Sequence, residues 1–442
     1  MPDFPDSEAI ERIQKAMPTQ GMFDQKSWRT SARPFPLSPE TLEELRRLGL
    51  VLNRFQRACN LIYRRSVLGS LPSWIHDYLD RGKPKALIEF GRARSLYDTV
   101  PGVIRPDLVL RENDFAITEI DTVPGGIGLT GWLNQTYAEL GYNVIGGANG
   151  MNDGFAKMFP KGADIVISEE AGDYRPEMEW LTQQLGPETW QLHQAETYKP
   201  RDVPIYRFFE LFDLGNVPFA QRIIETRANA VAVNPPMKAY LEEKLWLALF
   251  WMQPLQDVWR RELRASNWEW LQERIPYGWV VDSTPIPHHA VLPKLGIRDF
   301  QELAGFSQKM RNLVLKISGF SERAWGSRGV HMAMDLPQDE WADALLEATD
   351  SFPHHPYVLQ EFRKGRKVEH PYYDEETGKT VTMTGRVRLC PYYFVPGDDH
   401  GRSIGRPQLG GVMATICPED KKVLHGMKDA IIVPCIEMEN GY

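Results

Sequence analysis

The chain has 442 residues, a formal net charge of −8, and 42% hydrophobic and 25% charged residues. That length is too great for one simple core, so we expect about two or three structural lobes of a globular protein. The acidic balance argues against a general nucleic-acid binder, because such proteins carry a basic patch.

The cysteines and the distribution of apolar residues indicate in which cellular environment the protein is expected. The four cysteines are scattered and form no CxxC pair, so we expect no zinc site and a reduced, cytoplasmic environment. The N-terminus is acidic and contains prolines, without the basic and apolar regions of a signal peptide. No apolar run reaches about 18 residues, so we expect no membrane-spanning segment.

The first hundred residues are predicted to be an arm followed by helices. Residues 1–35 have the pattern of an extended arm. Ser38 and Pro39 combine an N-cap with a first-turn proline, and leucines at helical spacing continue the helix to about residue 63. Residues 70–98 also have a broken helical pattern.

Residues 104–120 predict a β-hairpin of two apolar strands joined by a polar turn. Arg105 and Asp107 are two residues apart and therefore point to one face, as do Glu119 and Asp121 on the second strand. Three carboxylates beside one arginine would repel each other unless a cation lay among them, and hard oxygen ligands suit Mg²⁺. The alternative is an ordinary edge hairpin with solvated acids.

Beyond the hairpin, helices and strands alternate. A glycine-rich turn precedes a helix at 129–140, whose N-terminus can hold an anion. Further strands are expected at 143–145, 163–168, 189–193, 204–209 and 230–233, and further helices at 178–185, 219–226, 238–253, 258–273 and 300–306. This alternation is typical of an α/β protein.

The last third is rich in strands. They are expected at 313–317, 329–334, 357–362, 380–389 and 411–416, with a helix at 337–349. Lys316 ends an apolar strand, and a glycine- and serine-containing loop with two arginines follows it. A strand, a lysine and a flexible loop can together cover a triphosphate. The alternative for this lysine is an exposed strand edge.

Two other strands of this region carry polar groups. The strand at 357–362 ends in polar residues that could contact an adenine edge, or it could be a plain buried strand. Arg386 and Arg388 share one face of their strand. Such a pair suits a carboxylate or phosphate, but it could equally pair with structural acids.

At this point the chain resembles the glutathionylspermidine synthase-like, circularly permuted ATP-grasp ligases. The likeness rests on three islands: Arg105-Pro106-Asp107 followed by Glu119-Ile120-Asp121-Thr122-Val123-Pro124; Val233-Asn234-Pro235-Pro236 with Lys244; and Val314-Leu315-Lys316 with the 322–330 loop and Tyr357-Val358-Leu359-Gln360. In ordinary ATP-grasp chains the nucleotide lysine precedes the metal acids. Here the acids come first, which is the permuted order.

The resemblance implies an α/β (α+β) fold that is ATP-grasp-like and circularly permuted, with mixed and antiparallel sheets flanked by helices. Along it we expect four segments: 1–100, an N-terminal arm and helical region; 101–235, a metal- and substrate-binding lobe; 236–310, a helical connector; and 311–442, a strand-rich ATP-binding lobe.

The resemblance also implies site residues. Asp107, Glu119 and Asp121 would be Mg²⁺ ligands, although Asp121 stands where the family usually has asparagine, which keeps an oxygen ligand and adds a charge. Arg105 would neutralise the transferred phosphoryl group. The implied ATP-binding residues are Lys316 at the phosphates, Gly326, Ser327 and Arg328 in the covering loop, and Gln360 at the adenine.

The implied activity is ATP-dependent carboxylate–amine (C–N) ligation through an acyl-phosphate, with release of ADP and phosphate. The partners would be a small-molecule or peptide-like carboxylate and an amine, with no nucleic acid and no membrane. The region before Arg105 is too short for the amidase domain of some family members, so we expect that domain to be absent. Two alternatives stay open: an ATP-dependent phosphotransferase, and a degenerate ATP-grasp domain used as a binding scaffold. The sequence carries no signal for the oligomeric state.

Overall fold

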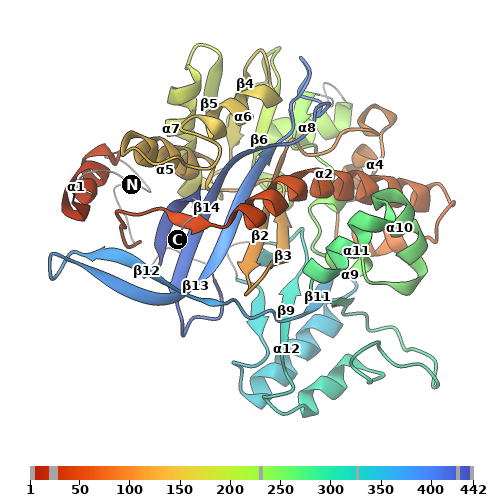
Figure 1. The fold of residues 1–442 in the computed structure, drawn as a ribbon. Helices are drawn as coiled ribbons and strands as arrows, with labels where there is room; N and C mark the ends of the chain where they lie inside the picture. The colour runs from red at the N-terminus through yellow and green to blue at the C-terminus, as the bar shows by residue number, and fades with distance from the viewer. Residues whose placement is uncertain (1–4, 19–27, 228–231, 325–327, 425–428, 439–442) are drawn as a thin grey trace. The chain divides into compact units, whose positions relative to one another are not determined.

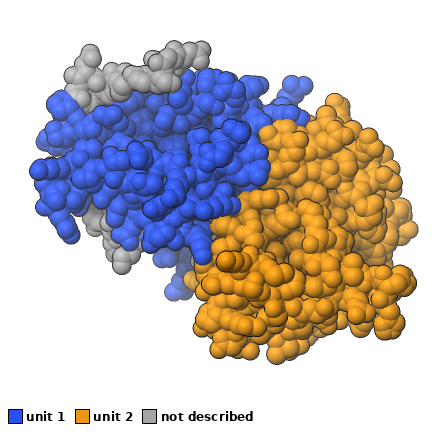
Figure 2. All heavy atoms as spheres, turned by 60° about the horizontal axis from the view of Figure 1, so that its bottom comes forward, with its two compact units in different colours: residues 1–56, 93–237, 364–442 blue, residues 57–92, 238–363 orange. Residues whose placement is uncertain are grey.

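A computed structural model describes residues 5–18, 28–227, 232–324, 328–424 and 429–438 (Figure 1). Its contacts divide the chain into two compact units, coloured separately in Figure 2. Unit 1 comprises residues 1–56, 93–237 and 364–442, and unit 2 comprises residues 57–92 and 238–363. Both units are discontinuous in sequence, whereas the four segments expected from the sequence are each continuous.

Unit 1 contains a large, mainly antiparallel sheet that includes the predicted hairpin. Its strands follow the order β1-β15-β14-β13-β2-β3, with β12 paired to β13. Their bounds are β1 Phe35–Leu37, β2 Val103–Leu110, β3 Phe115–Asp121, β12 Lys367–Asp374, β13 Lys379–Phe394, β14 Gln408–Pro418 and β15 Ile431–Glu437. Only β1 runs parallel to its neighbour, β15, among these paired strands.

The ladder between β2 and β13 is divided into two stretches by proline. Arg388 and Leu389 pair with Val109 and Leu108 at one end, and Tyr393 and Phe394 pair with Ile104 and Val103 at the other. Pro106 and Pro391 lie in the interval, and proline has no N–H to donate to a ladder. Arg105 and Asp107 lie on either side of Pro106, so two of the predicted site residues are beside this interval.

A second sheet in unit 1 is parallel, with the order β5-β4-β6-β7. Its strands are β4 Ala163–Ile167, β5 Trp190–Gln194, β6 Ile205–Phe208 and β7 Val233–Asn234. These strands confirm the alternating α/β pattern. The strand expected at 143–145 is wrong, because only Val144 makes an isolated bridge, to Ile436. Residues 230 and 231 of the strand expected at 230–233 lie outside the described residues.

Helices flank both sheets of unit 1, and α5 and α6 pack on β14 (Figure 1). The helices are α1 Asp6–Ala16, α5 Ile127–Glu139, α6 Gly150–Met158, α7 Arg175–Leu185 and α8 Pro218–Thr226, together with the first part of α2 Pro39–Val67. The expected extended arm is wrong for α1, whose apolar side is buried and whose last residue, Ala16, accepts a hydrogen bond from Trp132 Nε1 of α5 at 3.1 Å.

Unit 2 is built on an antiparallel sheet of order β10-β9-β11-β8. Its strands are β8 Gly278–Val280, β9 Leu313–Ile317, β10 Val330–Met332 and β11 Tyr357–Glu361. The helix α12, Gln338–Asp350, covers one face, where Trp341 and Leu345 meet Leu315 and Leu359 in a buried core. The remaining helices are α3 Trp74–Asp80, α4 Lys85–Gly91, α9 Leu245–Leu249, α10 Gln256–Leu263 and α11 Ala265–Arg274.

The long helix expected at 238–253 is wrong, because only the five residues of α9 are α-helical there. At the start of α9, the Leu245 N–H donates to the Ser318 hydroxyl at 3.2 Å instead of to a helical carbonyl. A tertiary contact therefore overrides the local helix propensity. The helix expected at 258–273 is divided into α10 and α11 at Arg264, whose φ is +67°.

The mixed α/β architecture, with mixed and antiparallel sheets flanked by helices, agrees with the expectation from the sequence. Among the residues that the structure describes, no helix has the length and apolarity needed to cross a bilayer.

Trp341→Ala should lower the free energy of unfolding by about 3–5 kcal/mol, because it removes a large core side chain and leaves a cavity. Trp341 is fully buried, and its Nε1 donates to Leu303 O at 3.1 Å. Urea unfolding followed by circular dichroism measures the loss. Leu346→Ala on the same helix is the control, because Leu346 is 51% exposed. Equal losses in the two variants would contradict the core assignment.

Candidate functional site

The hairpin β2–β3 places the predicted acids on one face. Arg105 lies opposite Asp121 in the ladder, and Asp107 lies opposite Glu119. The register shifts directly after Asp107, which leaves Thr118 as an extra residue on β3. Bulges of this kind redirect side chains beside functional sites. The structure therefore brings together the four residues that the spacing grouped.

Arg105 holds two of the three predicted metal ligands. Its Nη1 binds Asp107, and its Nη2 donates to Asp121 Oδ2 at 2.7 Å. Burial raises the pKa of Asp121, although Arg105 and the Val123 N–H oppose this shift. Burial alone would lower the pKa of Arg105, but Asp107 and Asp121 hold it well above its ordinary value. Arg105 is therefore a fixed cation between two carboxylates.

The neighbouring strand β13 adds two groups to Asp107. Arg388 Nη1 lies 3.2 Å from Asp107 Oδ2, and the Cys390 thiol donates to Asp107 Oδ1 at 3.4 Å. Burial raises the pKa of Cys390 to about 11, so it is a thiol rather than a thiolate near neutral pH. Arg388 is thus the member of the Arg386/Arg388 pair that joins the site. Arg386 donates to backbone carbonyls instead.

Three polar atoms near Asp107 retain hydrogen-bonding capacity. Arg105 Nε, Arg388 Nε and the Thr415 hydroxyl are buried and have no hydrogen-bond partner among the described residues. Thr415 lies opposite Arg388 in the β13–β14 ladder. Buried donors without partners are rare in folded proteins, and they mark places where water or a ligand completes the network. This site therefore has donors left for an anionic group.

The acids fit Mg²⁺ in chemical type, although they do not form a finished cage. The described residues contain no group of three His, Cys, Asp or Glu side chains arranged to hold a metal. Mg²⁺ is commonly bound by one or two carboxylates, with waters and substrate phosphates completing its octahedron. Asp107 and Glu119, opposite one another in the ladder, and Asp121 beside them are acids of this chemical type.

The glycine turn after β3 does not leave a helix N-terminus open for an external anion. The Glu177 carboxylate of α7 occupies it, accepting from Gly126 N at 2.7 Å and from Leu129 N at 3.1 Å. Gly126 has a φ of +87°, and a Cβ there would lie 2.3 Å from the Tyr392 hydroxyl. Glycine is therefore required at this turn. A carboxyl group of the chain itself therefore occupies this helix N-terminus.

In unit 2 the structure brings Lys316 and Gln360 together. They lie on the adjacent strands β9 and β11, and Lys316 Nζ donates to Gln360 Oε1 at 3.2 Å. Gln360 is 2% exposed, and its Nε2 has no hydrogen-bond partner among the described residues. A buried amide donor beside a lysine is suited to an acceptor on a ligand. Their predicted roles in ATP binding stay predictions.

The predicted covering loop is described only in part. Gly326 and Ser327 lie outside the described residues, and Arg328 is exposed. Arg323 binds Glu347 of α12, and Lys244 Nζ donates to Ala324 O at 2.7 Å. These two contacts fix the first part of the loop to other residues of unit 2.

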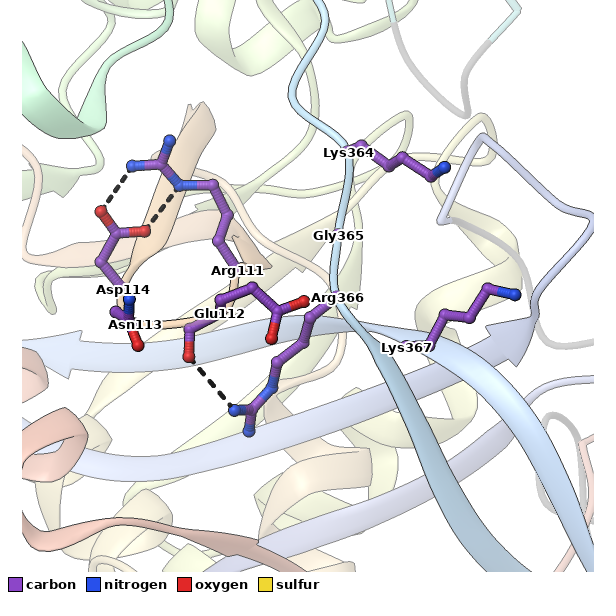
Figure 3. Close-up of a pocket in the computed structure, with 8 residues that line it drawn as sticks. All are labelled: Arg111, Glu112, Asn113, Asp114, Lys364, Gly365, Arg366 and Lys367. Atoms are coloured by element: carbon purple, nitrogen blue, oxygen red, sulfur yellow. Dashed lines mark hydrogen bonds and ion pairs between the residues drawn. The ribbon is translucent and has the colours of Figure 1, made fainter.

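A surface cavity of about 550 Å³ lies elsewhere in unit 1, between the β2–β3 turn and residues 364–367 (Figure 3). Arg111 binds Asp114 through two hydrogen bonds of 2.6 and 2.5 Å, which neutralises it. Lys364 and Lys367 point away from that pair in Figure 3. The cavity contains none of the predicted site residues, and its cations do not converge.

Glu177→Gln tests the buried carboxyl at the glycine turn. Burial raises the pKa of Glu177 from 4.5 to about 7. The folded chain thus binds this proton more tightly than the unfolded chain, so the stability contributed by Glu177 falls as pH rises from 4.5 through about 7. The wild-type free energy of unfolding minus that of Glu177→Gln should fall by up to roughly 3 kcal/mol across this window.

Urea unfolding at a series of pH values measures this difference. Glu179→Gln is the control, because Glu179 is exposed on the same helix, and its difference from wild type should be flat. A flat difference for Glu177→Gln as well would mean that the carboxyl does not titrate in this window.

Comparison with solved structures identifies a protein with a similar overall fold. A glutathione synthetase-like effector from Globodera pallida, solved in its apo form, matches 93% of this chain and 90% of its own, with a TM-score of 0.53 and 11% identity. A putative gamma-glutamylcysteine synthetase from Methylobacillus flagellatus matches 84% of each chain with 11% identity, but its TM-score of 0.39 supports no argument. No protein-family model and no curated protein matches the sequence.

The first likeness concerns the fold alone. The chain shares its mixed α/β fold with this glutathione synthetase-like effector, which agrees with the mixed α/β class expected from the sequence. The likeness is to a glutathione synthetase-like protein, and it does not single out the glutathionylspermidine synthases.

Proposed function

We propose that this chain is an ATP-dependent carboxylate–amine ligase that acts through an acyl-phosphate. The observation that carries the proposal is the cluster in which Arg105 and Arg388 hold Asp107, with Glu119 and Asp121 beside it. Two fixed guanidinium groups with unused buried donors suit a substrate carboxylate that becomes an acyl-phosphate. The ATP-grasp-like fold is consistent with this chemistry.

Unit 2 is proposed to bind the nucleotide. Lys316 would contact the ATP phosphates, and Gln360 with its neighbours on β11 would contact the adenine. Their 3.2 Å contact and the unused Gln360 Nε2 support a shared ligand. Arg328, Gly326 and Ser327 are proposed to cover the phosphates, as the resemblance implies.

Unit 1 is proposed to hold Mg²⁺ and the substrate carboxylate. Asp107, Glu119 and Asp121 would hold the metal, which when bound supplies charge neutralisation for the ATP phosphates. Arg105 and Arg388 orient the carboxylate and neutralise charge at the oxygens of the transferred phosphoryl group. A carboxylate oxygen would attack the γ-phosphorus of ATP, and ADP would leave. An amine would then attack the acyl carbon of the acyl-phosphate, phosphate would leave, and the amine proton would pass to solvent.

The substrate is proposed to be a peptide-like or amino-acid carboxylate. The motif order of the glutathionylspermidine synthase-like ligases supports this class, and so does the glutathione synthetase-like description of the structural neighbour.

A thermal-shift titration with ATP and Mg²⁺, alone and together, tests the proposal. A ligand that binds only the native state stabilises it by about 2.7 kcal/mol at a hundredfold excess over its dissociation constant. We expect a Mg²⁺-dependent shift with ATP, followed by ADP release that requires both a carboxylate and an amine. ADP release without an amine would indicate a phosphotransferase, and no shift with any nucleotide would indicate a scaffold.

Lys316→Ala should weaken ATP binding by about one to two orders of magnitude, because it removes the ammonium group assigned to the phosphates. Calorimetric titration measures the dissociation constant. Lys309→Ala is the matched control, because Lys309 is exposed in the same unit and carries the same charge. An ATP dissociation constant unchanged by Lys316→Ala would remove this lysine from the site.

Glu119→Ala should abolish ADP formation while leaving the melting temperature of the ligand-free chain nearly unchanged, because a half-exposed carboxylate contributes little to stability. Glu112→Ala, an exposed acid at the tip of the same hairpin, should keep full activity. Turnover that survives Glu119→Ala would show that the metal assignment is wrong.

A further inference from the structure

A buried ion pair in unit 2 lies outside every residue assigned above. The side chains of Lys83 and Glu243 are 2% and 1% exposed, and Lys83 Nζ binds Glu243 Oε1. The two residues come from distant parts of the chain, before α4 and before α9. Replacing a buried ion pair by apolar side chains of similar size is often neutral or stabilising. A contribution to folding stability is therefore a weak explanation for the presence of this ion pair.

The second oxygen of Glu243 holds the chain where it leaves β9. Glu243 Oε2 accepts from the Ser318 hydroxyl and from Gly319 N, the latter at 3.1 Å. Ser318 is fully buried, and its hydroxyl oxygen in turn accepts from Leu245 N. A Cβ on Gly319 would lie 2.8 Å from the Glu242 carbonyl oxygen, so the two segments are in close contact.

This contact point is adjacent to the residues proposed to bind ATP. Ser318 comes two residues after Lys316, and its N–H donates to Pro356 O, directly before β11. Lys244, next to Glu243, donates to Ala324 O at 2.7 Å. Residues 243 and 244 thus fix both ends of the stretch from Ser318 to Ala324.

We propose that Lys83 and Glu243 are positioning residues for the nucleotide phosphates. Glu243 orients the Ser318–Gly319 backbone, and through it the end of β9 that presents Lys316. Lys83 holds Glu243 in place through their buried ion pair, so that the second carboxylate oxygen meets these donors. The inference rests on the proposed function, because it concerns the same ATP-binding unit.

Two double variants separate the effect of the oxygen acceptor at position 243 from the effect of the Lys83–Glu243 charges. Both Lys83→Met/Glu243→Gln and Lys83→Met/Glu243→Met remove the ion pair, but only the first keeps an oxygen that can accept from Ser318 and Gly319. The glutamine variant should bind ATP with Mg²⁺ at least about tenfold more tightly than the methionine variant, because small displacements of a binding group are costly. Amide hydrogen exchange should show faster exchange at Gly319 in the methionine variant only.

A control removes a different buried contact of the same unit. Tyr78→Phe deletes the hydrogen bond to Asp282, so it should change the melting temperature without changing ATP affinity. The double variants avoid leaving a single uncompensated charge buried, which would threaten folding.

The outcomes distinguish this inference from its premise. If wild type binds ATP and the two double variants bind it equally, the positioning role is overturned while the proposed function stands. If wild type binds no nucleotide under any condition, the proposed function fails and the inference fails with it. If only the methionine variant loses affinity and Gly319 protection, both are supported.

Discussion

The Asp107 carboxylate, with 15% of its side chain exposed, binds two guanidinium groups from different strands. Loss of either arginine would leave a partly buried charge without part of its compensation, so the acid, Arg105 and Arg388 depend on one another. The sheet provides the space for this arrangement. Two prolines interrupt the β2–β13 ladder beside the cluster, and a bulge on β3 redirects the opposing strand. Local backbone irregularity and buried charge therefore occur together, as they often do at functional sites.

The spacing of residues along one hairpin was enough to predict four members of this cluster. Arg105, Asp107, Glu119 and Asp121 lie on one hairpin, so the period of two places them on one face before any tertiary contact forms. Cys390 and Thr415 could not be found in this way, because they reach the cluster only through pairing with strands distant in sequence. Arg388 showed a partial signal, a shared face with Arg386, but the sequence did not tell which arginine meets an acid.

Contacts between residues distant in sequence also explain two differences from the sequence-based expectations, one in unit 2 and one at the glycine turn. A helix was expected at 238–253 because its apolar spacing is strong, but Glu243 and Leu245 bind Ser318 instead of extending the helix. Glu177 had no local signal, since its role depends on a helix N-terminus about fifty residues earlier. By contrast, Lys316 and Gln360 were expected to cooperate from the order of motifs, and adjacent strands do bring them together.

The discontinuity of the two units sets the order in which they can form during synthesis. Unit 2 needs no residue beyond 363, so its strands and helices can pack once that point has left the ribosome. Unit 1 must wait, because Phe35 of β1 pairs with Cys435 of β15, which is made much later. The emerging chain therefore holds β1 and the β2–β3 hairpin without their final neighbours until β13 to β15 have been made. Unpaired strand edges of this kind are sites of non-native pairing, so the interval before β15 is made is when unit 1 is most exposed to misassembly.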